Sequence, residues 1–556
     1  MNSETRICTK CAQNFTLDTD ELSFYAKTQV PPPSVCPDCR FKMRALFRNE
    51  TTLCSGRKCI LCGKAILSMY NPKARYTLYC FSCYQGDGWE PKKYGIYYNP
   101  DEPFFNQLEG LLLRVPKAGT YRSISTGPNI NSDYVNMAGG VKNCYFVFNS
   151  GPDEDCMYSR GIKDCTELVD VYFGSKSNQS YETVSILESS KIIYGKNITG
   201  SVDCAYGLNL SGCNDCFGCV NLRGKSHYFL NKPLPPREYQ ARVEEIMGSY
   251  EKTEAFKKEF EKFSLQFPRR ESNGLKNLNT QGDYLYECRN VKYSFESVKA
   301  ENCRYLFSSK EAKDSVGLIG YGFNSEMLLE CVATGHSARV VGSLAIENSE
   351  DIYYSFFLRN CRNCIGCDGL KNAKYCILNK QYERKEYEEI KEKIITELKS
   401  KDLHGLMPPV ELAPFAYNET IAQDNMPLTR AEALAQGFRW EDDVQKTEGK
   451  ETLRVDQIPD HIGDVSNKIT QEILACLECN RNYKITEQEL LFYRKLNIPL
   501  PRKCFYCRHG ERVRRRGPYK FWSRNCAKCQ KAITTNYSPD RPEVVYCEKC
   551  YQREVY

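Results

Sequence analysis

The sequence predicts a mainly β protein: tandem parallel β-helix (β-solenoid) blocks, flanked by N- and C-terminal double zinc-ribbon modules, with short capping helices. Three observations predict this fold class. Sixteen of the 31 cysteines form eight CxxC pairs at the two ends of the chain. The interior is duplicated at an offset of about 148 residues, and each copy carries corners rich in Asn, Asp and Ser about every 12 residues.

The terminal cysteines repeat one spacing at both ends. Each end contains two units, and each unit contains two CxxC pairs. The distance between the two pairs of the first unit is the same at both ends of the chain. The distance within the second unit is shorter, and it is also the same at both ends. Two CxxC turns can direct four sulfurs at one ion, which suits tetrahedral zinc and leaves no open position for a substrate. We therefore expect about four structural zinc ions per chain, held by Cys8, Cys11, Cys36, Cys39, Cys59, Cys62, Cys80, Cys83, Cys476, Cys479, Cys504, Cys507, Cys526, Cys529, Cys547 and Cys550.

Three other interpretations of these cysteines compete with zinc: iron, disulfides and a redox-active CxxC motif. Iron can occupy an all-thiolate shell, which does not exclude it. Disulfides require an oxidising compartment, and the polar start of the chain carries no apolar signal segment. A redox-active CxxC would occur once, in a βαβ context, and not eight times in paired register.

The two first units also match outside their cysteines. Each has an aromatic residue, a Glu-x-x-Phe-Tyr stretch (Glu21–Tyr25 and Glu489–Tyr493) and Pro-x-x-CxxC-Arg. This pattern resembles a family of probable zinc-ribbon domains (treble-clef-like, CxxC…CxxCR), and the whole chain resembles large zinc-ribbon proteins of small-genome uncultured bacteria. The resemblance covers about 45 residues per copy and implies metal binding. Cys54 has no counterpart in the second copy and is expected to be a spare buried thiol.

Each interior copy predicts a β-solenoid. Short β-branched and aromatic runs such as Val169–Phe173 and Tyr353–Phe357 lie between turn-forming corners, which is typical of strands. Regular strand-and-corner repeats indicate a solenoid, in which each rung covers its apolar face with the next. Two corners per coil predict about 24 residues per rung. An antiparallel barrel or sandwich is the alternative, but it needs tighter Asn-Gly or Asp-Gly turns.

Helices are expected after each block, where apolar residues recur at helical steps. They would cover an end of the solenoid that otherwise exposes strand edges. The predicted domains are a zinc module at 1–90, a connector at 91–120, block 1 at 121–235, a capping helix at 236–270, block 2 at 271–382, a capping helix at 383–400, a Pro-containing tether at 401–470 and the second zinc module at 471–556.

Apart from Cys54, the other 14 cysteines lie in the blocks, seven in each. Inward stacking as small apolar residues is the simpler interpretation. The alternative is a further metal or iron–sulfur site in block 2. Its four candidate ligands are Cys361, Cys364, Cys367 and Cys376, but Tyr228 replaces the last of them in block 1.

Positive charge is concentrated beside the cysteines. Residues 40–58 carry a net +5 and residues 502–524 a net +8, so the rest of the formal +7 chain is at −6. Arginines interleaved with aromatic rings suit phosphate contact and base stacking. The alternative is that the charges offset the thiolate centres and stay solvated. The predicted nucleic-acid contacts, with RNA slightly favoured, are Arg40, Lys42, Arg44, Arg48, Arg508, Arg512, Arg514, Arg515, Arg516, Lys520, Trp522 and Arg524.

The sequence offers little for catalysis. The five histidines are scattered, and no phosphate-binding loop, nucleophile elbow or His-Glu-x-x-His motif occurs. Asp153, Glu154 and Asp155, with Arg160, form the best candidate catalytic cluster, at a corner where acids usually serve turns. We therefore predict a non-enzymatic cytoplasmic scaffold that binds nucleic acid or a ribonucleoprotein, with no membrane and no small-molecule substrate. A protein–protein assembly platform is the alternative, and a carbohydrate-active β-helix enzyme comes third.

Overall fold

The computed structural model describes residues 3–122 and 127–555; residues 123–126, at the start of the predicted first block, lie outside the described residues. The chain forms two compact units, and each unit is assembled from two separate stretches. Unit 1 comprises Met1–Thr120 and Ser272–Asp442, and unit 2 comprises Tyr121–Glu271 and Asp443–Tyr556. The N-terminal cysteine module therefore packs with block 2, and the C-terminal module packs with block 1.

Unit 1 contains a module of small hairpins and helices and a 12-stranded sheet. Its helices are α1 (Thr19–Thr28), α2 (Pro37–Ala45), α3 (Phe81–Gln85), α4 (Phe104–Arg114), α7 (Arg384–Ser400), α8 (Ile421–Asn425) and α9 (Arg430–Ala435). Its strands are β1 (Glu4–Ile7), β2 (Asn14–Leu17), β3 (Cys54–Lys58), β4 (Ala65–Ser68), β5 (Leu78–Tyr79), β6 (Lys117–Ala118), β21 (Gly274–Leu275), β22 (Gln281–Tyr286), β23 (Arg289–Val298), β24 (Glu301–Phe307), β25 (Ala312–Ile319), β26 (Ser325–Gly335), β27 (Ala338–Val341), β28 (Leu344–Glu347), β29 (Glu350–Tyr353), β30 (Arg362–Ile365), β31 (Lys374–Ile377) and β32 (Lys380–Gln381).

Unit 2 has the corresponding parts, with a 13-stranded sheet. Its helices are α5 (Pro236–Ile246), α6 (Tyr250–Ser264), α10 (Glu487–Lys495), α11 (Phe505–Arg516) and α12 (Glu548–Val555). Its strands are β7 (Val135–Ala138), β8 (Val147–Ser150), β9 (Asp153–Glu154), β10 (Arg160–Lys163), β11 (Cys165–Ser175), β12 (Asn178–Leu187), β13 (Ser190–Ile193), β14 (Lys196–Thr199), β15 (Val202–Ala205), β16 (Leu208–Ser211), β17 (Asn214–Phe217), β18 (Ser226–Phe229), β19 (Lys232–Pro233), β20 (Arg269–Arg270), β33 (Leu474–Ala475), β34 (Asn482–Tyr483), β35 (Trp522–Asn525), β36 (Ala532–Thr535) and β37 (Val545–Tyr546).

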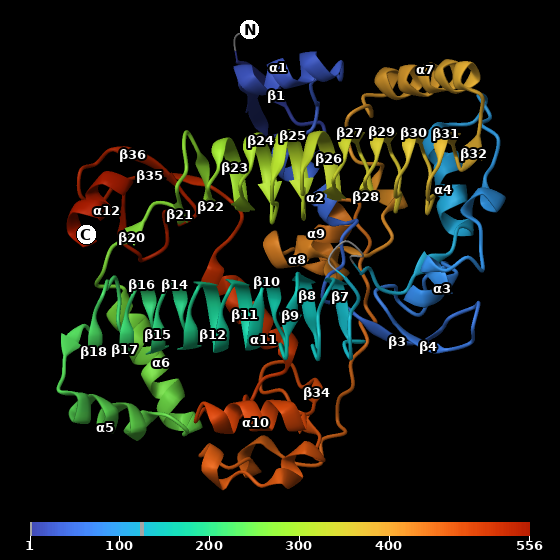
Figure 1. The fold of residues 1–556 in the computed structure, drawn as a ribbon. Coiled ribbons are helices and arrows are strands. Elements are labelled where there is room, and N and C mark those ends of the chain that lie inside the picture. The colour runs from blue at the N-terminus through green and yellow to red at the C-terminus, as the bar shows by residue number, and fades with distance from the viewer. Residues whose placement is uncertain (1–2, 123–126, 556) are drawn as a thin grey trace. The chain divides into compact units, whose positions relative to one another are not determined.

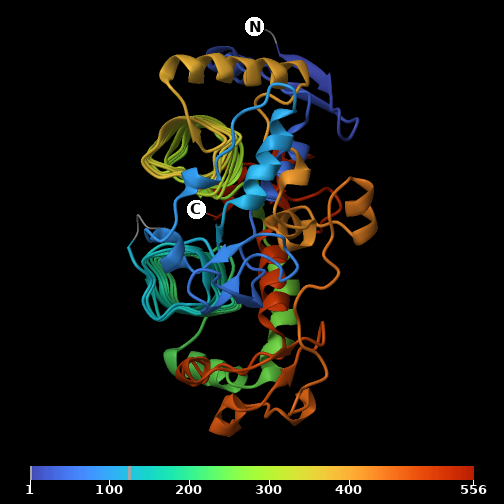
Figure 2. The same cartoon turned by 90° about the vertical axis from the view of Figure 1, so that its right-hand side faces the viewer.

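Both large sheets are parallel except for the last hairpin of each. Paired residues are 12 apart: Thr166 pairs with Asn178, and Asn178 pairs with Ser190. Block 2 keeps this step in most of its coils, but its first step is 11 residues, from Gly274 to Leu285, and the step between Ala312 and Ser325 is 13 residues. The predicted length of a rung is therefore wrong, because the chain returns to the same place after half of that length. Seen along the stacking direction, the strands of each block overlie one another in a ring (Figure 2).

The returning chain turns at every third residue. Positive φ recurs at steps of three, for example at Asp164, Glu167, Asp170 and Phe173, so that each return has up to four left-handed corners. Asn, Asp and Gly adopt this conformation at the lowest cost, which explains their recurrence in the sequence. The side chains that point inward are also three apart, as in Val135, Ala138, Val141, Cys144 and Val147.

Ladders of serine and cysteine side chains form hydrogen bonds with the buried backbone groups inside each block. Cys361 N–H donates to Ser349 Oγ at 3.0 Å, and Ser349 Oγ donates to the carbonyl of Glu347 at 2.8 Å. Cysteine takes the same place elsewhere: Cys144 Sγ donates to the carbonyl of Lys142 at 3.3 Å. At these positions a hydroxyl or thiol pairs backbone groups that water cannot reach. The block cysteines are thus part of the packing.

We expect Ser349→Ala to lower the free energy of unfolding of unit 1 by about 1–3 kcal/mol, because the N–H of Cys361 loses its buried acceptor. Ser349→Cys should cost less, because a thiol serves as the acceptor in a second ladder of the same block, where Cys367 Sγ accepts from Asn379 N–H. Urea unfolding of the two variants measures this difference. Equal losses in both variants would show that volume, and not the hydrogen bond, matters at this position.

The helices that follow the blocks pack on their final strands. In unit 2, α5 lies against β18, and Phe256 of α6 contacts Phe217 with ring centroids 4.7 Å apart. In unit 1, α7 lies against β31 (Figure 1). The ring centroids of Tyr387 and Tyr375 are 5.6 Å apart. Among the described residues, no helix is long and apolar enough to cross a membrane.

His404, which follows α7, is buried against Tyr354. The Tyr354 hydroxyl accepts from Gly405 N–H and is hydrogen-bonded to His404 Nδ1 at 2.9 Å. Burial, with Lys399 nearby, lowers the pKa of His404 from 6.5 to about 4. Unfolding therefore takes up a proton between these two pKa values, and acid weakens the unit.

We expect wild-type unit 1 to lose about 2 kcal/mol more stability between pH 7 and pH 5 than a His404→Gln variant, which keeps an acceptor but does not titrate. The measurement is the free energy of unfolding in urea at both pH values. Because both proteins carry the same carboxyl groups and cysteines, the difference isolates His404. Parallel pH profiles would contradict this assignment.

Candidate metal centres and the arginine helices beside them

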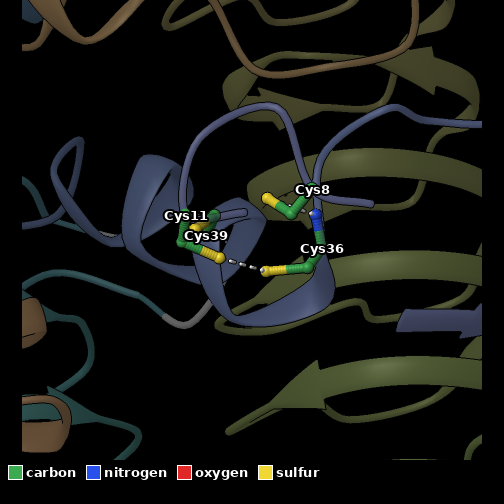
Figure 3. Close-up of side chains that lie close together, drawn as sticks. All are labelled: Cys8, Cys11, Cys36 and Cys39. Carbon is green, nitrogen blue, oxygen red and sulfur yellow. Dashed lines mark hydrogen bonds between the residues drawn. The ribbon is translucent and has the colours of Figure 1, made fainter. Parts of the chain in front are cut away.

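Four groups of four cysteines are assembled as the spacing predicts. In each group the four sulfurs lie within 4.8 Å of one another. The close Sγ–Sγ distances are 3.7 Å for Cys11–Cys36, Cys479–Cys504 and Cys529–Cys547, and 3.9 Å for Cys62–Cys80. A tetrahedral ion with metal–sulfur bonds of about 2.3 Å requires sulfurs about 3.8 Å apart, so the thiols fit such an ion. Figure 3 shows the first group converging.

Each centre joins a hairpin or turn to the start of a helix. The first CxxC pair lies on the turn, for example Cys526 and Cys529 between β35 and β36. The second pair begins a helix, with Cys36 as the N-cap of α2, Cys80 of α3 and Cys504 of α11. The positive end of each helix dipole faces the thiolates and favours their charge. These are zinc-ribbon-like sites, and the described residues could hold four metal ions.

Backbone N–H donors lower the thiol pKa of the first cysteine in three of the four centres. Burial opposes ionisation, but N–H groups from the opposite helix start and from the turn lower the pKa of Cys526 to about 6. The same balance lowers the pKa of Cys59 to about 6 and that of Cys476 to about 7. Thiolates are the ligand form, so the folded centres favour metal binding near neutral pH.

The remaining cysteines do not form another centre of this kind. The four groups above are those found among residues 3–122 and 127–555, and none includes Cys54 or a block cysteine. Cys54 is buried, and burial raises its pKa to about 11. Cys361, Cys364, Cys367 and Cys376 are buried, and each donates to a backbone carbonyl. Their geometry matches the ladder that serines form elsewhere.

The basic residues after the metal sites point into the units. In unit 1, Arg40 and Arg44 project from α2 onto block 2, and both are about 1 % exposed. Arg40 donates to Glu330 Oε1 at 2.9 Å and to Glu21 Oε1 at 3.1 Å, and Arg44 pairs with the other oxygen of Glu330. The guanidinium of Arg40 also lies 5.1 Å from the ring centre of Tyr305.

Unit 2 repeats this arrangement with a different acid. Arg508 donates to Asp170 Oδ2 at 2.7 Å, and Arg512 lies 2.7 Å from Asp170 Oδ1. Arg508 also lies 5.0 Å from the ring centre of Tyr158, whose hydroxyl donates to Glu489 at 3.0 Å. All of these side chains are buried. The helices that begin at the cysteine centres therefore hold their arginines against the blocks.

The docking sites lie on one corner column of each block, which we call the docking column. Its members recur once per coil and have positive φ. Four of its members are glycines, and the others are bulky or acidic residues that contacts with the module and helices stabilise, although Asn or Gly would turn more cheaply. The column is Phe146, Tyr158, Asp170, Glu182, Tyr194, Tyr206, Gly218 and Leu230 in block 1, and Tyr293, Tyr305, Gly317, Glu330, Gly342, Tyr354, Gly366 and Leu378 in block 2.

Burial controls the electrostatics of these contacts. It raises the pKa of Glu21 and of Glu489, although the facing arginine opposes this shift. Burial lowers the pKa of Arg44 and of Arg512. Charged partners are therefore essential here, because a buried charge without its counter-ion is strongly destabilising.

The other predicted nucleic-acid residues divide into two sets. Arg48 is buried with Glu50 at 2.6 Å, and Arg516 is buried, donating to the Tyr172 hydroxyl at 2.7 Å. Arg515 lies 3.7 Å from the ring centre of Tyr194. Accessible surface remains on Lys42, Arg514, Lys520, Trp522 and Arg524. Six of the twelve residues are therefore buried inside the units: Arg40, Arg44, Arg48, Arg508, Arg512 and Arg516.

The acidic cluster has structural partners. Asp153 Oδ1 accepts from Cys165 N–H at 2.9 Å, as a member of the internal ladder. Arg160 is buried and donates to Tyr172 at 3.1 Å. The sequence signal that was missed is the docking column: aromatic and acidic residues that recur once per coil at the same corner mark where another segment packs.

Comparisons with known proteins add little. No protein-family model matches the sequence, and no curated protein does. One solved structure that is similar is a putative acetyltransferase from Desulfovibrio desulfuricans G20, with 11 % identity over 47 % of this chain and 68 % of that one and a TM-score of 0.11. So low a score supports no conclusion about fold or activity.

Proposed function

We propose that this protein is a non-enzymatic, zinc-stabilised scaffold: two narrow β-solenoids, each clamped by a double zinc ribbon, that serves as an assembly platform for a protein partner. The observation that supports it best is that arginines of the two basic helices, α2 and α11, form ion pairs inside the units. Arg40, Arg44, Arg508 and Arg512 contact acids on the blocks and leave no charge at the surface. Zinc then fixes the clamps and takes no part in chemistry.

Zinc is the metal that these centres suit best. Four thiolates in a closed tetrahedron fit a structural site, and no position is left for a substrate. Such thiols remain reduced in the cytoplasm, which is where we place the protein. Metal analysis of protein purified under reducing conditions should give about four zinc ions per chain, and one or none would refute this assignment.

A groove on block 2 offers a surface for the partner. It encloses about 420 Å³ next to the longer step between Ala312 and Ser325, and its lining is polar. Its charged members are Glu311, Lys313, Glu326, His336, Glu350 and Arg362. Surfaces of mixed charge confer specificity through complementary pairs, so we propose a polar protein segment as its ligand.

The test is recovery of partners from native lysate with tagged full-length protein, followed by mass spectrometry. Glu326→Arg with Glu350→Arg should remove a defined set of proteins, whereas Glu188→Arg on block 1, an exposed residue paired with Lys176, should keep that set. Identical recoveries from both variants would refute the groove as the binding surface.

Nucleic-acid binding is the second candidate, and the accessible basic residues support it. The side chain of Arg514 is 65 % exposed, and Lys520 lies 5.5 Å from the ring centre of Trp522. We expect salt-dependent RNA binding, weakened by Arg514→Gln, Lys520→Gln and Arg524→Gln together. Unchanged binding in that variant, or none in the parent, would eliminate this function.

A further inference from the structure

Each zinc module packs with the block more distant in sequence, although the two modules and the two blocks are copies of each other. Alignment of the module cysteines makes Asp18 equivalent to Thr486, Phe47 to Arg515 and Arg48 to Arg516. The block equivalences follow from the two docking columns, taken in order. A swapped arrangement, with the N-terminal module on block 1 and the C-terminal module on block 2, is therefore conceivable. Contacts that differ between the two units must exclude it.

Residues that differ between the modules face residues that differ between the blocks. In unit 1, Arg304 of block 2 is 6 % exposed and donates to both carboxylate oxygens of Asp18, at 2.6 and 2.5 Å. The equivalent residues in unit 2 are Thr486 and Met157, which carry no charge. In a swapped pairing Arg304 would meet Thr486 and would be buried without its carboxylate, at a high energetic cost.

The arginine helix supplies a second matched pair. In unit 2, Arg515 lies over the ring of Tyr194. The equivalents in unit 1 are Phe47 and Gly342, and a Cβ at Gly342 would lie 2.7 Å from the carbonyl of Leu406. The module that carries an arginine therefore meets the block that carries its aromatic partner.

A third pair acts by shape. In unit 1, Arg48 packs against Gly320, where a Cβ would lie 2.4 Å from its Nη1. Block 1 has Phe173 at the equivalent corner, which would occupy the space of Arg48. In unit 2, Arg516 donates instead to Tyr172, for which block 2 has Ile319.

We infer that the two blocks are selective docking surfaces, each recognising its own zinc module through residue pairs that change together between the copies. Charge at Arg304 and the bulk of Phe173 oppose the wrong module, and the ring of Tyr194 favours the module that carries Arg515. Discrimination of this kind combines attraction to one partner with repulsion of its homologue. This recognition holds whether or not an external partner binds the groove.

Zero-length carbodiimide cross-linking of the full-length protein tests the pairing. Lys27 lies 3.9 Å from Asp314 in unit 1, and the equivalent Lys495 lies 2.7 Å from Glu167 in unit 2. Peptide mapping should find Lys27–Asp314 and Lys495–Glu167. The swapped pairing would give Lys27–Glu167 and Lys495–Asp314, and these products in the wild type would overturn the inference.

Charge reversal tests the selectivity. Arg304→Asp should lower the Lys27–Asp314 product by about tenfold, and adding Asp18→Arg should restore most of it. The Lys495–Glu167 product serves as the internal control in the same molecules. Protection of the block 2 cysteines from alkylation shows whether that block stays folded. An unchanged Lys27–Asp314 yield in Arg304→Asp, or no recovery in the double variant with block 2 still protected, would refute the assigned pairs.

Discussion

Replacement of Cys504 by serine is expected to lower the bound zinc from four to three ions per chain and to release α11 from block 1. Cys504 is both a ligand of the third centre and the N-cap of α11, so the loss of the ion removes the anchor of Arg508 and Arg512. Structural zinc contributes about 10–16 kcal/mol in isolated zinc fingers, and this variant should therefore have the largest effect. Metal analysis and urea unfolding of unit 2 are the measurements.

The matched control for Cys504→Ser is Cys361→Ser. Cys361 is also a buried cysteine, but it lies in a ladder in which the neighbouring coil already has Ser349. This variant should keep four zinc ions and nearly wild-type stability. Equal zinc content in the two variants would show that the terminal cysteines do not hold the metal.

Asp170→Asn is expected to lower the free energy of unfolding of unit 2 by about 3–5 kcal/mol, because Arg508 and Arg512 would remain buried without their shared carboxylate. Asparagine adopts the left-handed conformation of this corner, where φ is 59°, so the backbone does not oppose the change. Chemical unfolding followed by a probe in unit 2 measures the loss.

Two further variants make the Asp170 result specific. Asp203→Asn breaks an exposed pair with Lys191 at 3.5 Å and should cost less than about 1 kcal/mol. Replacement of Asp170, Arg508 and Arg512 together by apolar residues should restore part of the stability, because the two arginines no longer remain buried without Asp170. A similar loss in Asp170→Asn and Asp203→Asn would refute the clamp.

The metal centres were predictable because cysteine spacing is local. A CxxC turn and its partner lie within about 30 residues of each other, and the closed sulfur geometry follows from that distance. The parallel strands were also predictable, from corners that recur at a short and regular interval. The number of residues per coil could not be predicted. Inward residues such as Val141 and Cys144 are separated by outward residues of many kinds, and only the hydrogen-bond register shows where the chain returns.

The surface charge could not be predicted from local composition. A net +8 over residues 502–524 suggested an exposed basic patch, but the acid that faces Arg508 and Arg512 is Asp170, far earlier in the chain. Charge counts along the chain do not include partners brought close by folding. The exposure of Arg514 and the burial of Arg512, on the same helix, depend on which face of α11 meets the block.

The sequence by itself determined that two matching metal-binding modules enclose a duplicated, parallel-stranded interior, because repeat spacing and ligand chemistry are written in neighbouring residues. Only the tertiary structure decided which module meets which block. That choice depends on pairs such as Asp18 with Arg304, whose members are 286 residues apart. Such contacts form when the folded module packs on the folded block. Their energy depends on the burial of both charged partners, which the sequence of either segment alone does not reveal.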